Sequence, residues 1–412
     1  MRIGVLNWSP RRVAGAETYL ATVMPALQAA GHAVALVSEV DQPVDREPIA
    51  PASSAWCIAI MGMSHVVAEL RRWQPDVLYG HGLLDPASES RFLDIAPGVF
   101  VAHGFYGTCI SGTKSFKAPV ARPCDRRFGW PCLLHYYPHR CGGWNPLTMA
   151  RDFLRQANRL EILRRYAAII THSRRMESEY LKHDIPRERV HRVPWCVEES
   201  GERARQPVAG VRRDGRPHLV FLGRMTSAKG GHLLLHALPT IRSMLSRDIR
   251  VTFGGDGPER AAWERHAARL QERNPGLDVT FTGWLTADQR DAILDASDLL
   301  VLPSVWPEPF GQVGIEAGRR GVPTAAFALG GVLDWLENGV NGYLAPADPP
   351  KPRGLAAAVV NCLRNPETLT RLRRGAAQVA GRYSVAGHLA RLEPILGSIA
   401  RHPPAGGTGP AA

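Results

Sequence analysis

The sequence predicts an α/β protein made of two doubly wound domains that face each other across a cleft. Its 412 residues exceed what one ordinary core holds, so two domains are expected. Short apolar runs that do not alternate with polar residues indicate buried, parallel strands. The strand-and-helix pattern runs once, breaks at a polar stretch and then starts again, as two such domains in series require.

The first half opens with a strand at residues 3–6, a polar loop at 7–15 and a helix at 17–30. The helix carries its apolar residues on one stripe, and Gly31 ends it. Further strands are expected at 33–37, 77–79, 99–102, 168–171 and 190–193, with helices at about 64–73 and 151–166. The first domain therefore spans residues 1–197.

Residues 198–216 are polar, rich in Arg and Gly and without periodicity, which predicts an interdomain linker. The second domain, 217–382, restarts the pattern with strands at 218–222, 251–254, 279–281, 299–302 and 324–327. A helical pattern follows over 383–400. The last residues, 401–412, are rich in Pro and Gly and are predicted to be disordered.

The charge balance points to an anionic partner. Lys and Arg exceed Asp and Glu by 50 to 38, a net charge of +12, which suits nucleic acid, a phosphate-bearing substrate or an acidic membrane, or simply reflects a GC-rich genome. No groove-reading motif supports specific nucleic-acid binding. No apolar run approaches the roughly 20 residues that span a bilayer. The N-terminus lacks the features of a signal peptide, so a cytoplasmic location is expected.

The strongest motif is Glu308-Pro-Phe-Gly-Gln-Val-Gly-Ile-Glu316, which directly follows the apolar run 299–302. The first carboxylate lies on a strand-to-helix loop and the second lies about one turn into the helix. A carboxylate can accept hydrogen bonds from both vicinal hydroxyls of a ribose or hexose. Phe310 and Gly311 open the helix, where backbone N–H groups are available to a ligand.

This stretch resembles glycosyltransferase family 4, whose hallmark is two Glu separated by seven residues. The resemblance implies the GT-B fold, in which both domains are Rossmann-like. It also implies that Glu316 binds the ribose of a nucleotide and that Glu308 contacts the hydroxyls of the transferred sugar. The amides of Phe310 and Gly311 would hold the same sugar.

A cationic loop follows the first strand of the second half, in Gly223-Arg224-Met-Thr-Ser-Ala-Lys229-Gly230. Two cations five residues apart can converge on one diphosphate and stabilise the charge that develops on a leaving nucleoside diphosphate. The loop resembles the diphosphate clamp of the family, which assigns Arg224 and Lys229 to the donor diphosphate.

In the first half, the start of the first helix and the ends of three strands add candidates. Gly15 begins the first helix, where the family usually has Gly-Gly-x-Glu near the donor phosphate; here Ala14 replaces the first glycine. His103 follows the strand 99–102, and the resemblance places it at the transferred sugar near the reactive carbon. Many relatives have Asp after this His, whereas this chain has Gly104. His81 and His172 end two other strands and could line the cleft.

A cysteine-rich loop, residues 104–146, follows His103. Its cysteines are Cys109, Cys124, Cys132 and Cys141. The spacing lacks the close pairs of a zinc ribbon. Three alternatives remain for these cysteines. They could bind a structural zinc ion or iron–sulfur cluster, with His135 or His139 replacing one thiol; they could form a disulfide; or they could be unmodified thiols. The position of this long loop suggests a lid over the acceptor.

The helix expected at 151–166 combines five arginines with apolar residues and could rest on anionic lipid, or it could be a solvated helix that packs on the sheet. This leaves a contact with the inner face of the cytoplasmic membrane open. In the family, the last helix crosses back to the first domain, which would couple closure of the cleft to donor binding.

The resemblance implies a retaining transfer of a sugar from a UDP-, GDP- or ADP-sugar to a hydroxyl of a glycan or lipid-linked acceptor. It suggests a role in polysaccharide, lipid-linked glycan or glycoconjugate biosynthesis. The sequence lacks the Asp-x-Asp motif of metal-dependent transferases, so catalysis is expected to need no divalent cation. The alternatives are a nucleotide-sugar epimerase or hydrolase, and a catalytically silent homologue that binds a sugar nucleotide.

Overall fold

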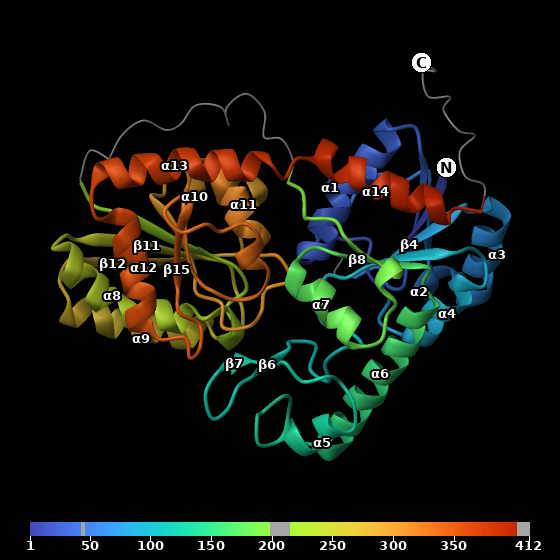
Figure 1. Ribbon diagram of the computed structural model, residues 1–412, viewed down its shortest axis with the longest axis horizontal. Helices are drawn as coiled ribbons and strands as arrows, with labels where there is room; N and C mark the ends of the chain where they lie inside the picture. The colour runs from blue at the N-terminus through green and yellow to red at the C-terminus, as the bar shows by residue number, and fades with distance from the viewer. Residues whose placement is uncertain (43–45, 198–214, 402–412) are drawn as a thin grey trace. The chain divides into compact units, whose positions relative to one another are not determined.

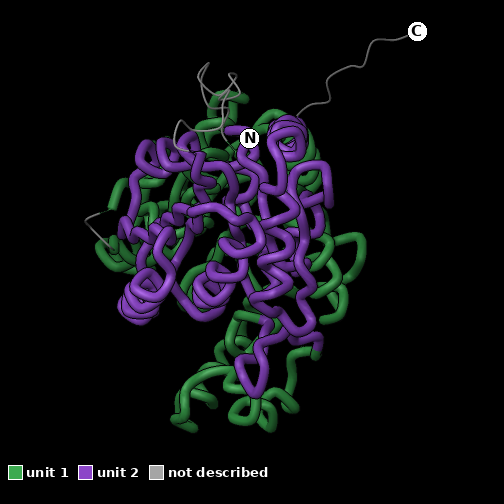
Figure 2. Tube along the Cα trace, turned by 90° about the vertical axis from the view of Figure 1, so that its left-hand side faces the viewer, with its two compact units in different colours: residues 1–113, 126–198, 384–412 green, residues 114–125, 199–383 purple. Residues whose placement is uncertain are grey.

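The computed structural model describes residues 1–42, 46–197 and 215–401. Its contacts divide the chain into two compact units (Figure 2). Unit 1 comprises Met1–Thr113, Arg126–Glu198 and Ser384–Ala412; unit 2 comprises Lys114–Asp125 and Glu199–Tyr383. The predicted linker, 198–216, and the predicted disordered tail, 401–412, lie outside the described residues except for 215, 216 and 401.

Unit 1 contains a seven-stranded sheet in the order β3-β2-β1-β4-β5-β8-β9, and every neighbouring pair is parallel. The strands are β1 (Arg2–Asn7), β2 (Ala33–Ser38), β3 (Ser54–Cys57), β4 (Val77–Gly82), β5 (Gly98–Val101), β8 (Ala168–Thr171) and β9 (Val190–Arg192). The central strands are buried along nearly their whole length, which explains why their sequences are continuous apolar runs.

Most helices of unit 1 pack around this sheet, whereas α5 lies away from it and packs against α6 (Figure 1). They are α1 (Gly15–Ala29), α2 (Ile58–Met61), α3 (Met63–Trp73), α4 (Pro86–Leu93), α5 (Pro131–Tyr136), α6 (Pro146–Arg165), α7 (Arg174–Lys182), the 3-10 turn η1 (Arg187–Arg189) and α14 (Val385–Ile399). The last of these comes from the end of the chain and packs against α1. It starts where the Ser384 side chain accepts a hydrogen bond from the Gly387 amide at 3.1 Å.

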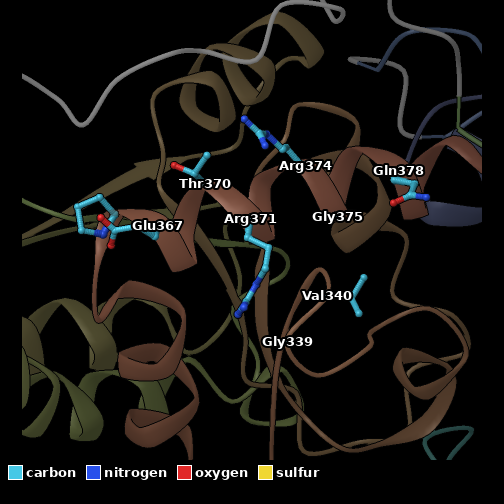
Figure 3. Close-up of a pocket in the computed structure, with 9 residues that line it drawn as sticks. Gly339, Val340, Glu367, Thr370, Arg371, Arg374, Gly375 and Gln378 are labelled. Carbon is cyan, nitrogen blue, oxygen red and sulfur yellow. The ribbon is translucent and has the colours of Figure 1, made fainter.

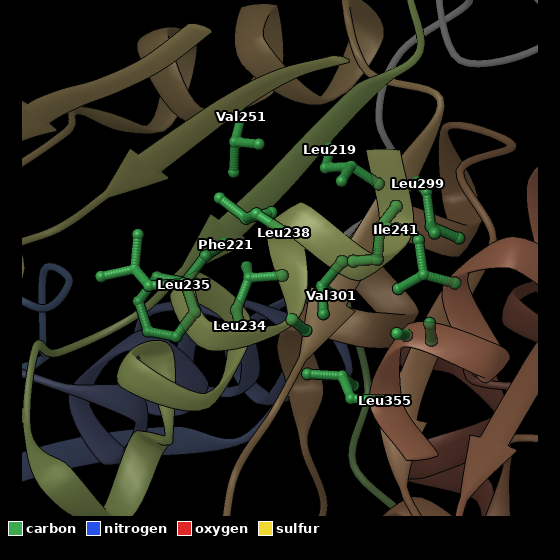
Figure 4. Close-up of a cluster of buried hydrophobic side chains, with 14 of the residues drawn as sticks. Leu219, Phe221, Leu234, Leu235, Leu238, Ile241, Val251, Leu299, Val301 and Leu355 are labelled. Carbon is green, nitrogen blue, oxygen red and sulfur yellow. The ribbon is translucent and has the colours of Figure 1, made fainter. Parts of the chain in front are cut away.

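Unit 2 contains a six-stranded parallel sheet in the order β12-β11-β10-β13-β14-β15. The strands are β10 (His218–Leu222), β11 (Ile249–Gly254), β12 (Leu277–Gly283), β13 (Leu299–Leu302), β14 (Thr324–Phe327) and β15 (Gly342–Ala345). The helical segments are η3 (Ser227–Lys229), α8 (Gly231–Leu245), α9 (Arg260–Arg273), α10 (Ala287–Asp295), α11 (Gln312–Arg319), η4 (Gly330–Asp334), α12 (Pro352–Leu363) and α13 (Pro366–Gly381). Buried side chains of β10, β11 and β13 meet those of α8 and α12 in one apolar core (Figure 4).

The cysteine-rich loop differs from the expected irregular segment. A two-stranded hairpin, β6 (Ser115–Phe116) and β7 (Arg122–Pro123), lies inside it, and α5 follows. The hairpin segment Lys114–Asp125 belongs to unit 2, because Ala121 packs against the core of that unit. The expected boundary of the first domain at residue 197 therefore omits this excursion.

Both sheets reverse their strand order beside their first strand, between β1 and β4 in unit 1 and between β10 and β13 in unit 2. Adjacent parallel strands whose connections leave in opposite directions open a crevice at their carboxyl ends, where ligands of doubly wound folds bind. The loops after β10 and β13 carry the predicted cations and carboxylates. The candidate site of unit 2 is therefore built at this switch point.

Candidate active site

Glu308 lies on the loop that connects β13 to α11, and its side chain is almost fully buried. Two hydrogen bonds to backbone oxygens hold this loop: the Gly331 amide donates to the Glu308 oxygen at 2.7 Å, and Trp335 Nε1 donates to the Phe310 oxygen at 2.7 Å. Gly311 has φ +83° and caps α11, so the helix begins right after the Phe310-Gly311 pair. The predicted loop-to-helix placement of the motif is thus observed.

Lys229 and Glu308 come together in the structure. Lys229 Nζ lies 2.7 Å from Glu308 Oε1, and Ser304 Oγ donates to the same carboxylate oxygen at 2.5 Å. The ammonium also lies 5.2 Å from the centre of the Trp306 ring. The cation that was assigned to the diphosphate therefore adjoins the carboxylate assigned to the sugar. Ser304 was not singled out from the sequence, although it lies only two residues after β13.

The loop after β10 is tightly fixed to its neighbours. The Met225 amide donates to the Asp256 oxygen at 2.8 Å, and the Val305 amide donates to the Ala228 oxygen at 2.9 Å. These bonds tie the cationic loop to the ends of both flanking strands. Arg224 is exposed on this loop and has no side-chain partner among the described residues. Its guanidinium is available to an anionic ligand.

Glu316 lies on α11, and its side chain is 13% exposed. Gln312 Nε2 donates to Glu316 Oε1 at 3.0 Å, and Arg290 Nη1 of α10 approaches the same oxygen at 3.3 Å. The sequence reasoning missed Arg290, since nothing in the order of residues pairs α10 with α11. These contacts hold the carboxylate in place and leave its second oxygen to accept from a ligand hydroxyl.

In unit 1, Gly15 is the first residue of α1, and Ala14 is its N-cap with φ −151°. This backbone is extended, so the alanine that replaces the family's glycine needs no positive φ. The buried Glu17 side chain closes the helix start by accepting from the Ala14 amide at 2.8 Å and from Trp8 Nε1 at 2.8 Å. The N-terminus of α1 therefore keeps its geometry despite the substitution.

The three predicted histidines of unit 1 gather at the carboxyl ends of β4, β5 and β8. His81 Nδ1 lies 2.7 Å from His103 Nε2, and the rings of His103 and His172 lie 5.4 Å apart. Tyr19 of α1 and Trp195 pack against the same rings at centroid distances of 5.3 and 5.5 Å from His103. Adjacent parallel strands explain the grouping, because His81 lies at the end of β4 and the other two histidines lie one or two residues after β5 and β8.

The histidines are held in their neutral form. Burial lowers the pKa of His172 to about 3 and the pKa of His388 to about 4. Burial also lowers the pKa of His81 and that of His103 well below the usual 6.5, and the neighbouring imidazoles lower them further. Neutral imidazoles exchange hydrogen bonds with hydroxyl groups and do not attract phosphate. The cluster therefore suits an uncharged sugar better than a diphosphate.

The directions of the hydrogen bonds follow from the neutral state. His172 Nδ1 donates to the Val193 oxygen at 3.0 Å, so its Nε2 carries a lone pair. Within the described residues, His172 Nε2, His81 Nε2 and His103 Nδ1 have no hydrogen-bond partner. In the His81–His103 pair, one ring donates its N–H to the other. Of the two remaining nitrogens, His81 Nε2 and His103 Nδ1, one therefore carries an N–H and the other a lone pair, whichever ring donates.

A second chain of bonds joins the cluster to the C-terminal helix. His388 Nδ1 donates to the Pro194 oxygen at 2.7 Å, so its Nε2 accepts from the Tyr19 hydroxyl at 2.8 Å. The Tyr79 hydroxyl then donates to the Tyr19 oxygen at 2.5 Å. Burial raises the pKa of both tyrosines, so neither ionises near neutral pH. Neither Tyr19 nor His388 was predicted from the sequence.

These neutral histidines predict acid sensitivity. Below about pH 6.5 these histidines bind protons in the unfolded chain but stay neutral in the folded one. The free energy of unfolding should therefore fall as the pH falls, by up to about 1.4 kcal/mol per pH unit for each such His. Denaturant unfolding at pH 5, 6 and 7 measures this slope. His388→Gln keeps one donor and one acceptor but removes one titrating group. Its slope should be shallower by about 1 kcal/mol per pH unit over this range, and equal slopes would contradict the account.

The thiols of the cysteine-rich loop lie next to backbone oxygens of the same loop. Across residues 1–42, 46–197 and 215–401, no three His, Cys, Asp or Glu side chains gather at metal-binding spacing. Cys132 Sγ lies 3.9 Å from the Arg127 oxygen, Cys141 Sγ lies 3.8 Å from the His135 oxygen, and all the cysteines are thiols. Zinc or iron–sulfur at Cys109, Cys124, Cys132 and Cys141 stays a prediction, which metal analysis of the purified protein tests.

A groove of about 640 Å³ lies elsewhere in unit 2, between the 339–340 loop and one face of α13 (Figure 3). Its lining residues are Gly339, Val340, Pro366, Glu367, Thr370, Arg371, Arg374, Gly375 and Gln378. None of the predicted donor residues lines it. The groove is therefore separate from the Lys229–Glu308 site.

Known proteins resemble both units. The family described as Glycosyltransferase Family 4 matches residues 13–200, and the family described as Glycosyl transferases group 1 matches residues 216–365. An alpha-D-kanosaminyltransferase of Streptomyces kanamyceticus is 27% identical over 274 residues, which are 63% of this chain and 69% of that one. The glycogen synthase of Mycobacterium tuberculosis is 28% identical over 416 residues, 92% of this chain and 90% of its own.

A solved structure extends the likeness to the whole fold. The structure of HepE from Anabaena in complex with UDP and glucose has a TM-score of 0.68 at 18% identity, and it covers 97% of this chain and 100% of its own. The two parallel α/β units and their structural neighbours show the GT-B fold, and the family matches and relatives define a glycosyltransferase. The chain belongs to glycosyltransferase family 4, as the Glu308–Glu316 motif predicted.

Proposed function

We propose that this glycosyltransferase moves a sugar from a nucleoside-diphosphate sugar to a hydroxyl group of a glycan or lipid-linked acceptor, with retention of the anomeric configuration. The pathway would be the synthesis of a polysaccharide, a lipid-linked glycan or a glycoconjugate. The observation that carries the proposal is the group formed by Lys229, Ser304 and Glu308 at the switch point of the unit 2 sheet. HepE, whose fold is similar, has been solved with UDP and with UDP-glucose.

The residues of this chain divide the work between charge and position. Arg224 and Lys229 would bind the diphosphate and stabilise the charge that develops as the nucleotide leaves. Glu316, held by Gln312 and Arg290, would accept the ribose hydroxyls. Glu308 would accept sugar hydroxyls while the Phe310 and Gly311 amides hold the same ring, and His103 would contact the sugar from unit 1.

No side chain of the site is assigned as a nucleophile. In the proposed reaction the acceptor hydroxyl attacks the same face of the sugar from which the diphosphate departs, and the leaving phosphate takes the hydroxyl proton. The bond from the anomeric carbon to the diphosphate breaks and a bond to the acceptor oxygen forms, so the configuration is kept. The rate then rests on positioning and charge stabilisation. We also propose that no divalent cation takes part, so EDTA should leave the rate unchanged.

A panel of UDP-, GDP- and ADP-sugars, scored by thermal shift and by nucleotide release, tests the donor. At least one should raise the unfolding temperature of the wild-type protein. Glu316→Ala should weaken that donor by about 10- to 100-fold, because a charged hydrogen bond contributes about 1.5–3 kcal/mol. Glu272→Ala, an exposed glutamate on α9, is the matched control and should bind like the wild type.

Four outcomes would decide against the proposal. Binding of no nucleotide sugar, or equal binding by Glu316→Ala and the wild type, removes the donor site. Nucleotide release that is equally fast without any acceptor favours the hydrolase or epimerase alternative. Tight binding with no turnover in the presence of hydroxyl acceptors favours a catalytically silent homologue.

A further inference from the structure

Large apolar side chains are exposed on one stretch of unit 1. Five of them lie between residues 130 and 154, on α5, on α6 and on the loop between these helices. They are Trp130, Leu134, Trp144, Leu147 and Leu154, with exposed fractions of 68%, 64%, 69%, 77% and 61%. We call these five residues the α5–α6 surface. Exposed apolar residues that cluster in this way mark an interaction site more often than isolated ones do.

The spacing of these residues places them on helix faces. Trp130 caps α5 and lies four residues before Leu134, so the two share a face. Leu147 and Leu154 lie seven residues apart on α6, with the exposed Arg151 between them on the same stripe. Each helix thus presents apolar side chains that are more than half exposed.

The opposite face of α6 is the one that packs on unit 1. Leu160 and Leu163 are buried, and Arg159, although charged, is buried against Glu89. Farther along, Arg165 is paired with Asp94. The arginines at the C-terminal end of the expected basic helix therefore serve the fold, and the lipid-facing role expected for residues 151–166 does not fit them. The exposed stripe lies at the N-terminal end of α6 instead.

The charge around this surface favours an anionic occupant. Residues 126–155 contain five arginines and one acidic residue, Asp152. The Arg140 guanidinium lies 5.6 Å from the centre of the Trp144 ring, so cation and aromatic are presented together. Tryptophan rings prefer the interface between water and lipid, where one edge stays wet, and arginines there neutralise anionic head groups.

We propose that the α5–α6 surface docks this protein on an anionic lipid bilayer. The apolar side chains would enter the head-group region while the arginines contact the lipid phosphates. No helix in the described ranges is long and apolar enough to cross a membrane, so the contact would be peripheral. The proposal goes beyond sugar transfer, and it holds or fails without any donor or acceptor present.

Co-sedimentation of the full chain with vesicles tests it. The protein should bind vesicles of phosphatidylcholine mixed with phosphatidylglycerol, and should bind phosphatidylcholine alone much more weakly. Added salt should weaken the binding, because it screens the arginines. The double variant Leu147→Ser/Leu154→Ser should reduce the partition coefficient by at least about tenfold, since it removes two large apolar side chains from the bilayer. Arg151→Gln should lower binding only to the anionic vesicles.

Met244→Ser is the matched control, because Met244 is also a large apolar residue on a helix surface, 55% exposed on α8 of unit 2. It should bind vesicles like the wild type. An unchanged thermal unfolding midpoint in all variants shows that they fold. Absence of vesicle binding, or equal binding by the double variant and Met244→Ser, overturns the proposal. A dimer in solution that the double variant converts to a monomer also overturns it, since a second copy then covers the surface.

Discussion

Lys229→Met should lower kcat/KM for sugar transfer by about 10²- to 10³-fold, the loss typical when a group that stabilises developing charge is removed. The methionine keeps the length of the side chain and removes its charge. Two effects act in the same direction. In the proposed reaction the leaving diphosphate loses a cation, and the buried Glu308 loses the partner that lies 2.7 Å away, which leaves only the Ser304 hydroxyl on that oxygen.

The kinetics separate these effects from simple misfolding. Lys351→Met makes the same change at an exposed lysine that caps α12 in the same unit, and it should leave kcat/KM unaltered. If Lys229 acts mainly on the transition state, kcat falls more than the affinity for the donor does. A variant with wild-type kcat would refute the assignment of Lys229 to the leaving group.

Gly230→Ala should destabilise the protein by about 3 kcal/mol or more and should abolish most of the activity. Gly230 has φ +69°, which costs an alanine about 1–2 kcal/mol. An added Cβ would also lie 1.8 Å from the Pro303 oxygen. The backbone after β13 would have to move, and with it Ser304 and the loop that carries Glu308.

The same substitution elsewhere in unit 2 should act in the opposite direction. Gly381 ends α13, and a Cβ built there meets no atom within 4 Å. Gly381→Ala should raise stability by a few tenths of a kcal/mol, up to about 1 kcal/mol. Calorimetry of the full chain should therefore show a midpoint about 5 °C or more lower for Gly230→Ala, and unchanged or slightly higher for Gly381→Ala. Equal midpoints would mean that the switch-point loop tolerates a Cβ.

The sequence predicted the strands that read as apolar runs, among them the edge strands β9 and β12. It missed β3 and β15, which lie at the edges of their sheets. The residues of β3, Ser-Ala-Trp-Cys, are half exposed and show no apolar run. Edge strands are stabilised by one neighbour only, and their residues carry a weaker pattern.

Site residues that belong to one segment could be predicted from the sequence, whereas contacts between distant segments could not. Glu308 and Glu316 share one motif, and their loop and helix followed from the strand before them. The Lys229–Glu308 pair joins residues 79 positions apart, and it depends on β10 and β13 being neighbours. Three histidines at strand ends could be listed from the sequence, but their grouping required the order β4-β5-β8.

The return of α14 to unit 1 has a consequence for synthesis. Unit 1 is completed by residues that follow unit 2, and its Tyr19–His388 bond joins positions 369 apart. On the ribosome, every residue of unit 2 therefore emerges before the last helix of unit 1 does. Unit 1 is therefore translated first, but its fold is completed only after unit 2 has been synthesised. For the same reason, a single splice cannot exchange one half for that of a relative; a working chimaera needs a second junction near Ser384.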